Sequence, residues 1–438
     1  MEGANGSLGK VKVGKPGFHF GRSPGWPDHP ILGSFNHATT SGSPYNRTTV
    51  LGIYVSVPFC RSKCSFCNFA SGVFSRDKMH AYVARLREEI ASAEALAMAF
   101  GAKFERSIDS IYLGGGTPTT LAPDQLLSIF HAIRDQFDVR PEAEITVECA
   151  PGTLRPEILD ALLEGGTNRI SLGTQSFINE EIKSVGRLHT AEQTLTDIGT
   201  LRAAGISNIN VDLIAGLPHQ TADTWHISLN QLAQSGVPHA SVYILEVDED
   251  SRLGRELMAG GERYHAHHVP DSDLVADLYL EAIDFLDGVG VPQYEISNFA
   301  GPGSESRHNL KYWTRQPYLG FGLDAHSMLY ASNTSTKLEC IRLANTDDLA
   351  AFSAGSSKPE PTLVDDQQAS EEIMFLGLRL NRGIDVEGEP VVQHFKQQIG
   401  ELCNAGLLEQ CGTFLRLTPQ GRLLSNEVFE RFIAVPAG

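Results

Sequence analysis

The chain has 438 residues, 41% of them apolar and 20% charged, which predicts a soluble globular protein with one large and one smaller folded unit. Its apolar runs fall short of the roughly 18 residues that a membrane span needs, and its net charge of −18 argues against nucleic acid, which would require a basic face. Seven cysteines, with no secretory signal segment ahead of them, argue against a disulfide framework and for the reducing cytoplasm.

Residues 1–48 differ in composition from the rest of the chain. Twenty-two of these positions are Gly, Pro, Ser or Asn, and no apolar period is visible. Burial of so few apolar side chains could not offset the entropy lost on ordering. The segment is therefore predicted to be a disordered tail.

Residues 49–300 alternate short β-branched runs with amphipathic helices, which is the pattern of βα units around a parallel sheet. The predicted strands are residues 51–57, 108–113, 144–149, 168–173, 209–214 and 239–246. Six units are fewer than the eight of a closed TIM barrel, so the predicted fold class is α/β with a partial (β/α)6 barrel. Ligands of such sheets bind beyond the carboxyl ends of the strands.

A loop of the pattern CxxxCxxC follows the first strand, with Cys60, Cys64 and Cys67 as its thiols. Three thiolates can bind three irons of a [4Fe-4S] cluster and leave the fourth iron without a protein ligand. S-adenosylmethionine (SAM) can fill that position through its amino and carboxylate groups, and its sulfonium then lies where one electron can break a carbon–sulfur bond. The alternative is structural zinc, which needs a fourth ligand and prefers paired CxxC elements. The loop therefore predicts a cluster with SAM.

The second strand leads into a turn, Gly114-Gly115-Gly116-Thr117-Pro118. Glycines at this point let backbone amides approach a ligand without steric conflict from a Cβ. A bare triple glycine is as often only a tight turn, so the prediction of a ligand contact depends on its register with the cysteine loop.

Four polar residues stand at or near the ends of later strands: Glu148, Gln175, Arg187 and Asp212. Each alone is more often part of a salt bridge or a cap than a ligand contact. Together they match the ammonium, the carboxylate and the two ribose hydroxyls that SAM presents. The same strand-end surface is therefore predicted to bind SAM.

The rest of the chain predicts a smaller second unit. Residues 301–358 are expected to extend the barrel and connect it to residues 359–438, a mostly helical, winged-helix-like domain. A hairpin is expected over residues 407–417, and Thr418-Pro419 is a helix start signal. Because the chain is acidic, this domain is interpreted as a docking or lid domain rather than a DNA-binding one.

These blocks together resemble a known group, the oxygen-independent coproporphyrinogen III oxidase-like branch of the radical SAM superfamily, and within it the HemW-type heme chaperones. The resemblance runs from about residue 51 to the C-terminus. Its further blocks are Glu144 to Glu148, Asn168 to Phe177, Gly216 to Pro218, Tyr294 to Phe299, His308-Asn309, Tyr312-Trp313 and Gly320 to His326.

The resemblance implies cofactors, partners and contact residues. It implies cluster ligation by Cys60, Cys64 and Cys67, a client that is heme or another tetrapyrrole, a heme-acceptor protein of unknown identity and an electron donor. It implies no residue with an assigned catalytic role. The implied SAM contacts are Tyr54, Phe66, Gly115, Gly116, Thr117, Glu148, Gln175, Arg187 and Asp212.

Two positions depart from relatives of this branch. The oxidase resembles this chain but carries a further Cys two residues after the third cluster ligand, where this chain has Phe69; this favours chaperone over oxidase. The family usually has His two residues before the Pro of the cysteine loop, where this chain has Ser56. A hydroxyl cannot replace an imidazole as iron ligand or proton relay at neutral pH.

His308 is the remaining candidate for a heme contact, because it lies between the barrel and the C-terminal domain beside Asn309, Tyr312 and Trp313. The alternative is a hydrogen-bonded core histidine. Three functions follow from the resemblance: a heme chaperone that keeps the cluster and SAM; a radical enzyme that decarboxylates coproporphyrinogen III or methylates a tetrapyrrole; and a scaffold that keeps the cluster only for stability. Whether the protein turns over a substrate is left open.

Overall fold

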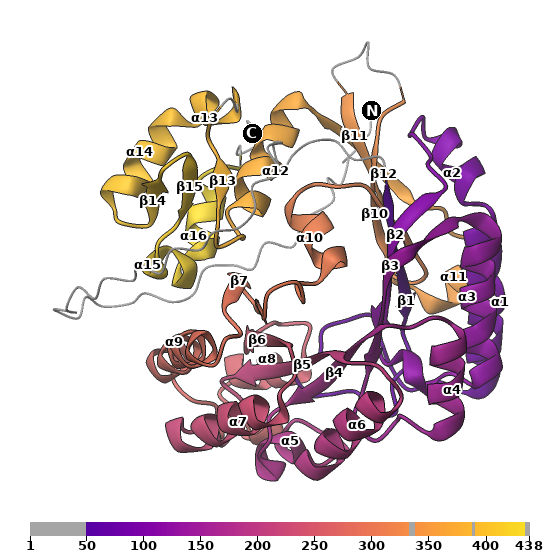
Figure 1. Cartoon of the computed structure of the whole chain (residues 1–438), viewed down its shortest axis with the longest axis horizontal. Helices are drawn as coiled ribbons and strands as arrows, with labels where there is room; N and C mark the ends of the chain where they lie inside the picture. The colour runs from indigo at the N-terminus through magenta and orange to yellow at the C-terminus, as the bar shows by residue number, and fades with distance from the viewer. Residues whose placement is uncertain (1–49, 333–337, 388–389, 434–438) are drawn as a thin grey trace, which may run out of the picture.

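The computed structural model describes residues 50–332, 338–387 and 390–433, and Figure 1 shows their arrangement. The predicted tail, residues 1–48, lies outside the described residues. A twelve-stranded sheet has the order β12-β11-β10-β9-β1-β2-β3-β4-β5-β6-β8-β7, and a second sheet has the order β13-β15-β14. In the described part of the chain, no helix is both long and apolar enough to cross a membrane.

Six neighbouring strands of the large sheet are parallel, which confirms the predicted α/β fold with a partial barrel. β1, β4 and β5 are buried along nearly their whole length, as expected of strands covered on both faces, whereas the first part of β3 and the end of β6 are exposed. The six strands are β1 (Leu51–Val57), β2 (Ser107–Gly115), β3 (Asp138–Cys149), β4 (Arg169–Gln175), β5 (Asn208–Ala215) and β6 (His239–Ile244).

Helices connect these strands and cover the outer face of the barrel (Figure 1). Most of the helices between the strands contribute apolar side chains to one large hydrophobic core that they share with the strands. These helices are α1 (Arg76–Ala91), α2 (Ala93–Ala99), η1 (Pro118–Thr120), α3 (Pro123–Gln136), α4 (Pro156–Glu164), α5 (Asn179–Ser184), α6 (Ala191–Ala203) and α7 (Ala222–Ser235). After β6 come α8 (Arg252–Met258), η2 (Arg263–His268) and α9 (Ser272–Gly288).

Strands outside the six predicted ones extend the sheet at both ends. β8 (Asn298–Ala300) pairs antiparallel with β6, and β7 (Gln293–Glu295) pairs with β8. On the other side, β9 (Tyr318–Phe321) runs parallel to β1, and β10 (His326–Tyr330), β11 (Leu338–Ala344) and β12 (Glu360–Asp365) follow antiparallel. β12 lies within residues 359–438 but belongs to the large sheet. The helices of this part are α10 (Arg307–Trp313) and α11 (Leu349–Ser353).

The chain after β12 forms a smaller domain around its own apolar cluster (upper left in Figure 1). The expected hairpin is present as β14 (Leu408–Cys411) and β15 (Phe414–Leu417), and the Thr418 hydroxyl accepts the N–H of Gly421 at 3.0 Å to cap the next helix. The other elements are α12 (Asp366–Gly377), β13 (Ile384–Asp385), α13 (Pro390–His394), α14 (Lys396–Asn404), α15 (Pro419–Leu423) and α16 (Ser425–Glu430).

Candidate radical SAM site

The cysteine loop is anchored at both ends. The N–H of Cys60 donates to the carbonyl of Gly72 at 2.8 Å, and the N–H of Gly72 donates to the carbonyl of Pro58 at 2.9 Å. Phe59 is fully buried beside this bridge, with its ring edge-on to Tyr82 at 5.1 Å between centroids. The loop therefore leaves the end of β1 in one fixed direction.

The three thiols of the loop influence one another through charge. Burial raises the pKa of Cys60, and nearby Cys67 raises it further, while the Thr117 hydroxyl at 3.8 Å lowers it. Burial also raises the pKa of Cys64, and Arg187 opposes that rise. Among the described residues, no group of three or more His, Cys, Asp or Glu side chains could hold a single metal ion. A [4Fe-4S] cluster does not require the three thiols to converge on one ion, since each thiolate binds a different iron.

The glycine turn lies against the loop so closely that a side chain could not be added. A Cβ on Gly116 would come within 2.6 Å of the Val57 carbonyl oxygen and 2.9 Å of the Phe59 nitrogen. Gly115 has φ +91°, a conformation that L side chains rarely adopt, and a Cβ there would meet the Ser56 hydroxyl at 2.8 Å. The turn and the cysteine loop therefore lie in contact; the predicted ligand contact of the turn stays a prediction.

Glu148 lies next to this turn at the end of β3 and is half-buried. Its carboxylate accepts the Tyr112 hydroxyl at 3.1 Å. Burial raises the pKa of Glu148 to about 8, the charge of Asp212 adds to the rise, and the Tyr112 hydroxyl, the Gly115 N–H and Arg187 oppose it. Glu148 is therefore a carboxyl group that changes protonation state near neutral pH.

Asp212 and Arg187 complete this polar surface. Asp212 accepts the Asn210 amide at 2.7 Å and the Ser171 hydroxyl at 3.2 Å, and burial raises its pKa despite these bonds. Arg187 donates to the Gly173 carbonyl at 2.7 Å, while its Nε is buried without a partner in the described part of the chain. A buried donor without a partner is costly unless a ligand supplies an acceptor.

The remaining predicted contacts are placed by the same strands. Gln175, the last residue of β4, is buried with φ +71°, an unusual conformation for a non-glycine residue. Phe66, inside the cysteine loop, packs on a small apolar cluster that includes Leu217 after β5. Tyr54 on β1 lies 6.2 Å from the Tyr112 ring, and burial and the nearby Glu148 raise its pKa.

A cavity of about 340 Å³ opens beside the glycine turn. This volume lies in the range of small-molecule sites. Ser56 and Phe69 both line it, and Phe69 is 62% exposed. The other lining residues are Tyr54, Ala70, Gly115, Tyr312, Tyr318, Leu323, Asp324 and His326.

Four of these lining residues, Tyr318, Leu323, Asp324 and His326, were given no role in a site by the sequence analysis, although three of them lie in the block Gly320 to His326. They come from β9, β10 and the turn between them, inside the segment interpreted only as an extension of the barrel. The signal that could have found them is the block Gly320 to His326, because β9 pairs with β1 and carries this turn to the cysteine-loop end of the sheet.

His308 lies on α10. It is fully buried, its Nδ1 lies 3.0 Å from the Ser110 hydroxyl, and its Nε2 lies 2.8 Å from the Tyr312 hydroxyl. Burial and the charge of Lys311 lower its pKa to about 3. Both ring nitrogens are therefore engaged in this conformation, which is the geometry of the hydrogen-bonded core histidine that the sequence left as the alternative.

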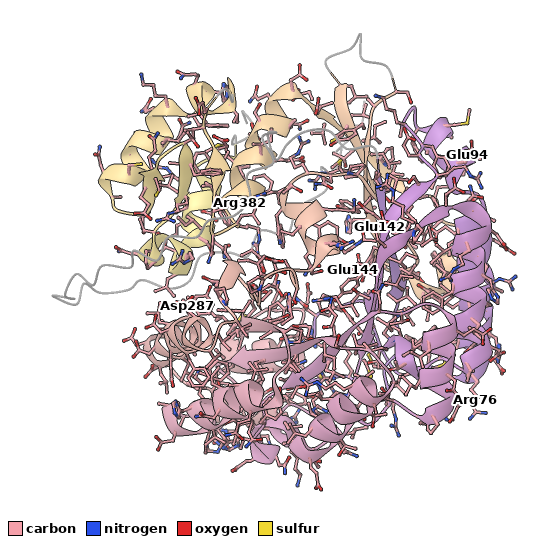
Figure 2. The ribbon with its side chains drawn as sticks, viewed as in Figure 1. Arg76, Glu94, Glu142, Glu144, Asp287 and Arg382 are labelled. Atoms are coloured by element: carbon pink, nitrogen blue, oxygen red, sulfur yellow. The ribbon has the colours of Figure 1, made fainter. Side chains whose placement is uncertain are left out.

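The start of α10 is held by a carboxylate of β3. Glu144 accepts the N–H of Arg307 at 3.1 Å and the N–H of His308 at 3.2 Å, and Figure 2 shows Glu144 and Glu142 beside this helix. A negative charge at a helix N-terminus is stabilising because the first N–H groups have no intrahelical partner. The position of His308 is thus fixed from the backbone as well as from its ring.

Comparison with known proteins identifies related sequences over most of the chain. The Radical SAM superfamily model matches residues 54–265, and the HemN C-terminal domain model matches residues 364–424. The "Heme chaperone HemW" of Lactococcus lactis subsp. lactis (strain IL1403) is 33% identical over 391 residues, which are 87% of this chain and 96% of that protein. The protein of the same name from Bacillus subtilis (strain 168) is 32% identical over 87% of this chain and 98% of its own length.

A solved structure extends the comparison to the fold. Coproporphyrinogen III oxidase (HemN) from Escherichia coli, described as a radical SAM enzyme, aligns with a TM-score of 0.71 over 89% of this chain and 92% of that chain. The two sequences are 23% identical. This likeness concerns the fold, including the partial barrel and the added C-terminal part.

Proposed function

The chain belongs to the HemW family within the radical SAM superfamily, and from that premise we propose that it is a heme chaperone that carries a [4Fe-4S] cluster and SAM and passes heme to an acceptor protein. The observation that carries the proposal is one surface at the ends of β1 to β5 on which the cysteine loop, the glycine turn and Glu148 meet. The expected compartment is the reducing cytoplasm, where free thiols persist.

We propose that Cys60, Cys64 and Cys67 hold the cluster. The chemistry of the donor set fits, because three thiolates suit three irons of a cubane and leave one iron for another ligand. When bound, the cluster supplies an electron to SAM. The anchored loop and the Thr117 hydroxyl near Cys60 would hold the thiols in position for it.

SAM would lie on the glycine turn. Glu148 would pair with its ammonium, the unpartnered Nε of Arg187 would donate to its carboxylate, and Asp212 would accept its ribose hydroxyls. Gln175, Tyr54, Phe66, Gly115, Gly116 and Thr117 would provide the remaining contacts of the same pocket. The adjoining cavity beside Phe69 would lie next to the reacting end.

Anaerobic reconstitution with iron and sulfide, followed by hemin titration and product analysis, tests the function. The proposal expects a cluster absorption band, SAM binding, a Soret band on addition of hemin and transfer of heme to an apo-hemoprotein. Conversion of coproporphyrinogen III to protoporphyrinogen IX under reducing conditions would establish the oxidase instead. A protein that took up zinc in place of iron and sulfide, or bound no hemin, would refute the proposal.

A further inference from the structure

A second pocket, of about 540 Å³, lies against the cysteine loop and shares no lining residue with the cavity beside the glycine turn. Its lining residues belong to that loop, to the end of α5 and the chain after it, to the start of α8 and to the segment around η2. We call it the pocket beside η2. Its volume is that of a small-molecule site, and none of the proposed cluster ligands or SAM contacts is among its described lining residues.

The lining of this pocket is polar and mostly cationic. Lys63, Lys183 and Arg252 carry positive charge, and among the described residues that line the pocket only Glu262 carries a carboxylate. The Lys63 ammonium uses one of its donors on the Phe69 carbonyl, at 3.1 Å. The whole chain, in contrast, has a net charge of −18. Because a local group of cations concentrates small anions, the expected ligand is a polar anion rather than an apolar molecule.

Arg252 is held at the pocket with one donor unused. Its guanidinium lies over the Tyr264 ring at 5.3 Å, and one of its terminal nitrogens donates to the Lys63 carbonyl. Its Nε is buried and has no hydrogen-bond partner in the described part of the chain. Lys183, near the end of α5, is exposed and brings a second cation to the same pocket. Arg252 and Lys183 therefore retain donors for a ligand.

A buried hydroxyl in the wall of the pocket also has no partner. Ser65 lines the pocket but is only 2% exposed, and its Oγ makes no hydrogen bond with the described residues. Since a buried hydroxyl normally has a partner, a ligand that accepts its proton would remove the cost of leaving it unpaired. Two unpartnered donors, on Ser65 and on Arg252, thus come from different elements to one pocket. The expected ligand carries acceptor oxygens for both.

The cysteine loop is fastened to the walls of this pocket by hydrogen bonds. The N–H of Ser65 donates to the Val185 carbonyl at 3.0 Å, and the Ser65 carbonyl accepts the N–H of Leu253 at 2.8 Å. The Ser62 hydroxyl donates to the Gly186 carbonyl at 3.1 Å. Val185 follows α5 and Leu253 belongs to α8, so a ligand that joins these two walls would also hold the loop in place.

We propose that the pocket beside η2 binds the phosphate group of a small molecule, with Arg252 and Lys183 pairing with its charge and the Ser65 hydroxyl donating to one of its oxygens. A phosphate group carries a charge of about −1.5 to −2 at pH 7 and three acceptor oxygens. It therefore suits donors on several walls better than a carboxylate does. The exposed His265 and His267 add further donors. The inference goes beyond the proposed heme chaperone function and does not depend on it.

Neither a metal ion nor an acidic protein fits these residues as well. Among the described residues, no group of three or more His, Cys, Asp or Glu side chains could hold a metal ion. An acidic protein could meet the exposed Lys183, but Ser65, at 2% exposure, is out of reach of a large partner. A small anion that enters the pocket can contact both.

Titration calorimetry with inorganic phosphate tests the site in the full-length, cluster-loaded protein with SAM added, at constant ionic strength in chloride buffer. Saturable binding with a Kd below about 1 mM is expected. Lys183→Gln should weaken this binding about threefold, whereas Lys103→Gln, at an exposed lysine elsewhere, should bind phosphate as the parent protein does. Ribose 5-phosphate, titrated in parallel, identifies the source of the group: tighter binding than inorganic phosphate indicates a phosphate ester, and weaker binding indicates the free anion.

Ser65→Ala tests the buried hydroxyl. It should weaken phosphate binding about fivefold, because one donor is lost. It should not lower the midpoint of thermal unfolding of the phosphate-free protein, because the hydroxyl has no partner among the described residues; a merely structural role would lower that midpoint. Thr167→Val is the matched control, since Thr167 is 5% exposed and its hydroxyl also lacks a partner in the described part of the chain. It should keep the phosphate affinity of the parent protein.

Amide hydrogen exchange tests the connection to the cysteine loop. Saturating phosphate should slow exchange in a peptide that covers residues 60–67, because the ligand joins the walls to which the loop is bonded. Exchange in α3, which contributes no lining residue to the pocket, should be unchanged.

Absence of saturable phosphate binding, or the parent affinity in both Lys183→Gln and Ser65→Ala, would overturn the inference. Binding of poly-glutamate without binding of phosphate would also overturn it, because the cations would then serve an acidic protein partner. Hemin titration of the same preparation keeps this inference apart from the proposed function. A protein that binds hemin but no phosphate refutes the phosphate site alone, and one that binds phosphate but no hemin refutes the chaperone function alone.

Discussion

His308 and His267 stand in opposite environments, and the contrast separates two uses of the same side chain. His308 is buried, hydrogen-bonded through both nitrogens, and carried on a helix whose start is fixed by Glu144. His267 is exposed on the irregular turn η2 and faces a pocket with three cations. Burial engages the first imidazole, whereas exposure leaves the second available for a ligand.

A histidine in a segment that resembles the family is therefore not necessarily the histidine that is exposed to solvent. His308 belongs to such a block and was the heme candidate from the sequence, yet it is part of the packing between β2 and α10. His265 and His267 belong to no such block. The signal that could have found them is the short tract Tyr264 to His268, with three histidines in five residues.

The largest expected effect is loss of the cluster on substitution in the cysteine loop. This loop carries the proposed cluster ligands, and its residues Lys63 and Ser65 line the pocket beside η2. Cys64→Ala should abolish the cluster, because a cubane with only two protein thiolates lacks an anchor for the third iron. Lys63→Gln, one residue away, should retain it. Iron and sulfide content and the visible spectrum after anaerobic reconstitution measure both. Full iron content in Cys64→Ala would contradict cluster ligation by this residue.

The second largest effect is the difference in the free energy of unfolding between variants of His308 and of His267. His308→Ala should lower the free energy of unfolding by about 3–4 kcal/mol, because it creates a cavity and leaves the Ser110 and Tyr312 hydroxyls without a partner. His267→Ala should change it by less than about 0.5 kcal/mol. Urea unfolding of both variants measures the difference. Equal losses in the free energy of unfolding of the two variants would contradict the difference in burial between His308 and His267.

The parts of the molecule that could be predicted from the sequence are those with a pattern of neighbouring residues that indicates them. The six parallel strands follow from continuous apolar runs, and the cysteine loop and the glycine turn follow from spacing alone. The strands β9 to β12 could not be assigned, because β9 pairs with β1 across about 265 residues of the chain, as between Tyr54 and Gly320, and β10, β11 and β12 are then added to β9 one after another. Short edge strands carry too little pattern to predict such a register.

Charge and pocket geometry were equally out of reach of the sequence. A pocket of about 540 Å³ beside η2 combines Lys63, Lys183 and Arg252 from three distant segments. Nothing in the sequence joins them, since each alone is an ordinary surface cation. The Nε of Arg187, which has no hydrogen-bond partner among the described residues, also could not be found from the sequence, because the packing of the folded chain determines which donors are removed from water.

Glu89 on α1 is a buried carboxyl group that should make the stability of the protein depend on pH. Its carboxylate accepts the Gly322 N–H at 2.8 Å and the Asn345 amide at 2.7 Å, and so supports the turn that carries Asp324 and His326. Burial raises its pKa from 4.5 to about 7. Between these two values the folded protein keeps a proton that the unfolded chain has lost, so the free energy of unfolding should fall as pH rises and level off above pH 7.

Glu89→Gln should remove that slope, which is worth about 1.4 kcal/mol per unit of pKa difference, and should leave the protein with a flatter pH profile. The neighbouring Glu88→Gln is the control, since Glu88 is exposed and pairs only with Arg85 at 3.3 Å. Urea unfolding from pH 5 to pH 8 measures both variants. An unchanged slope in Glu89→Gln would assign the pH dependence to other groups.

The smallest effect concerns Glu148, a carboxyl group of the site whose pKa burial raises to about 8. With a pKa of about 8, it is largely protonated at pH 7, because it is buried beside Asp212 with only partial compensation from Tyr112 and Arg187. Pairing with the ammonium of SAM needs the carboxylate, so SAM affinity should rise with pH up to about 8 and then level off. Glu148→Gln should lose about tenfold in affinity above that pH and most of the pH dependence, whereas Glu142→Gln, on an exposed part of the same strand, should keep both. Equilibrium binding of SAM to the reconstituted protein measures this, and a parallel pH profile in Glu148→Gln would remove Glu148 from the ammonium contact and leave Asp212 as the carboxylate to test next.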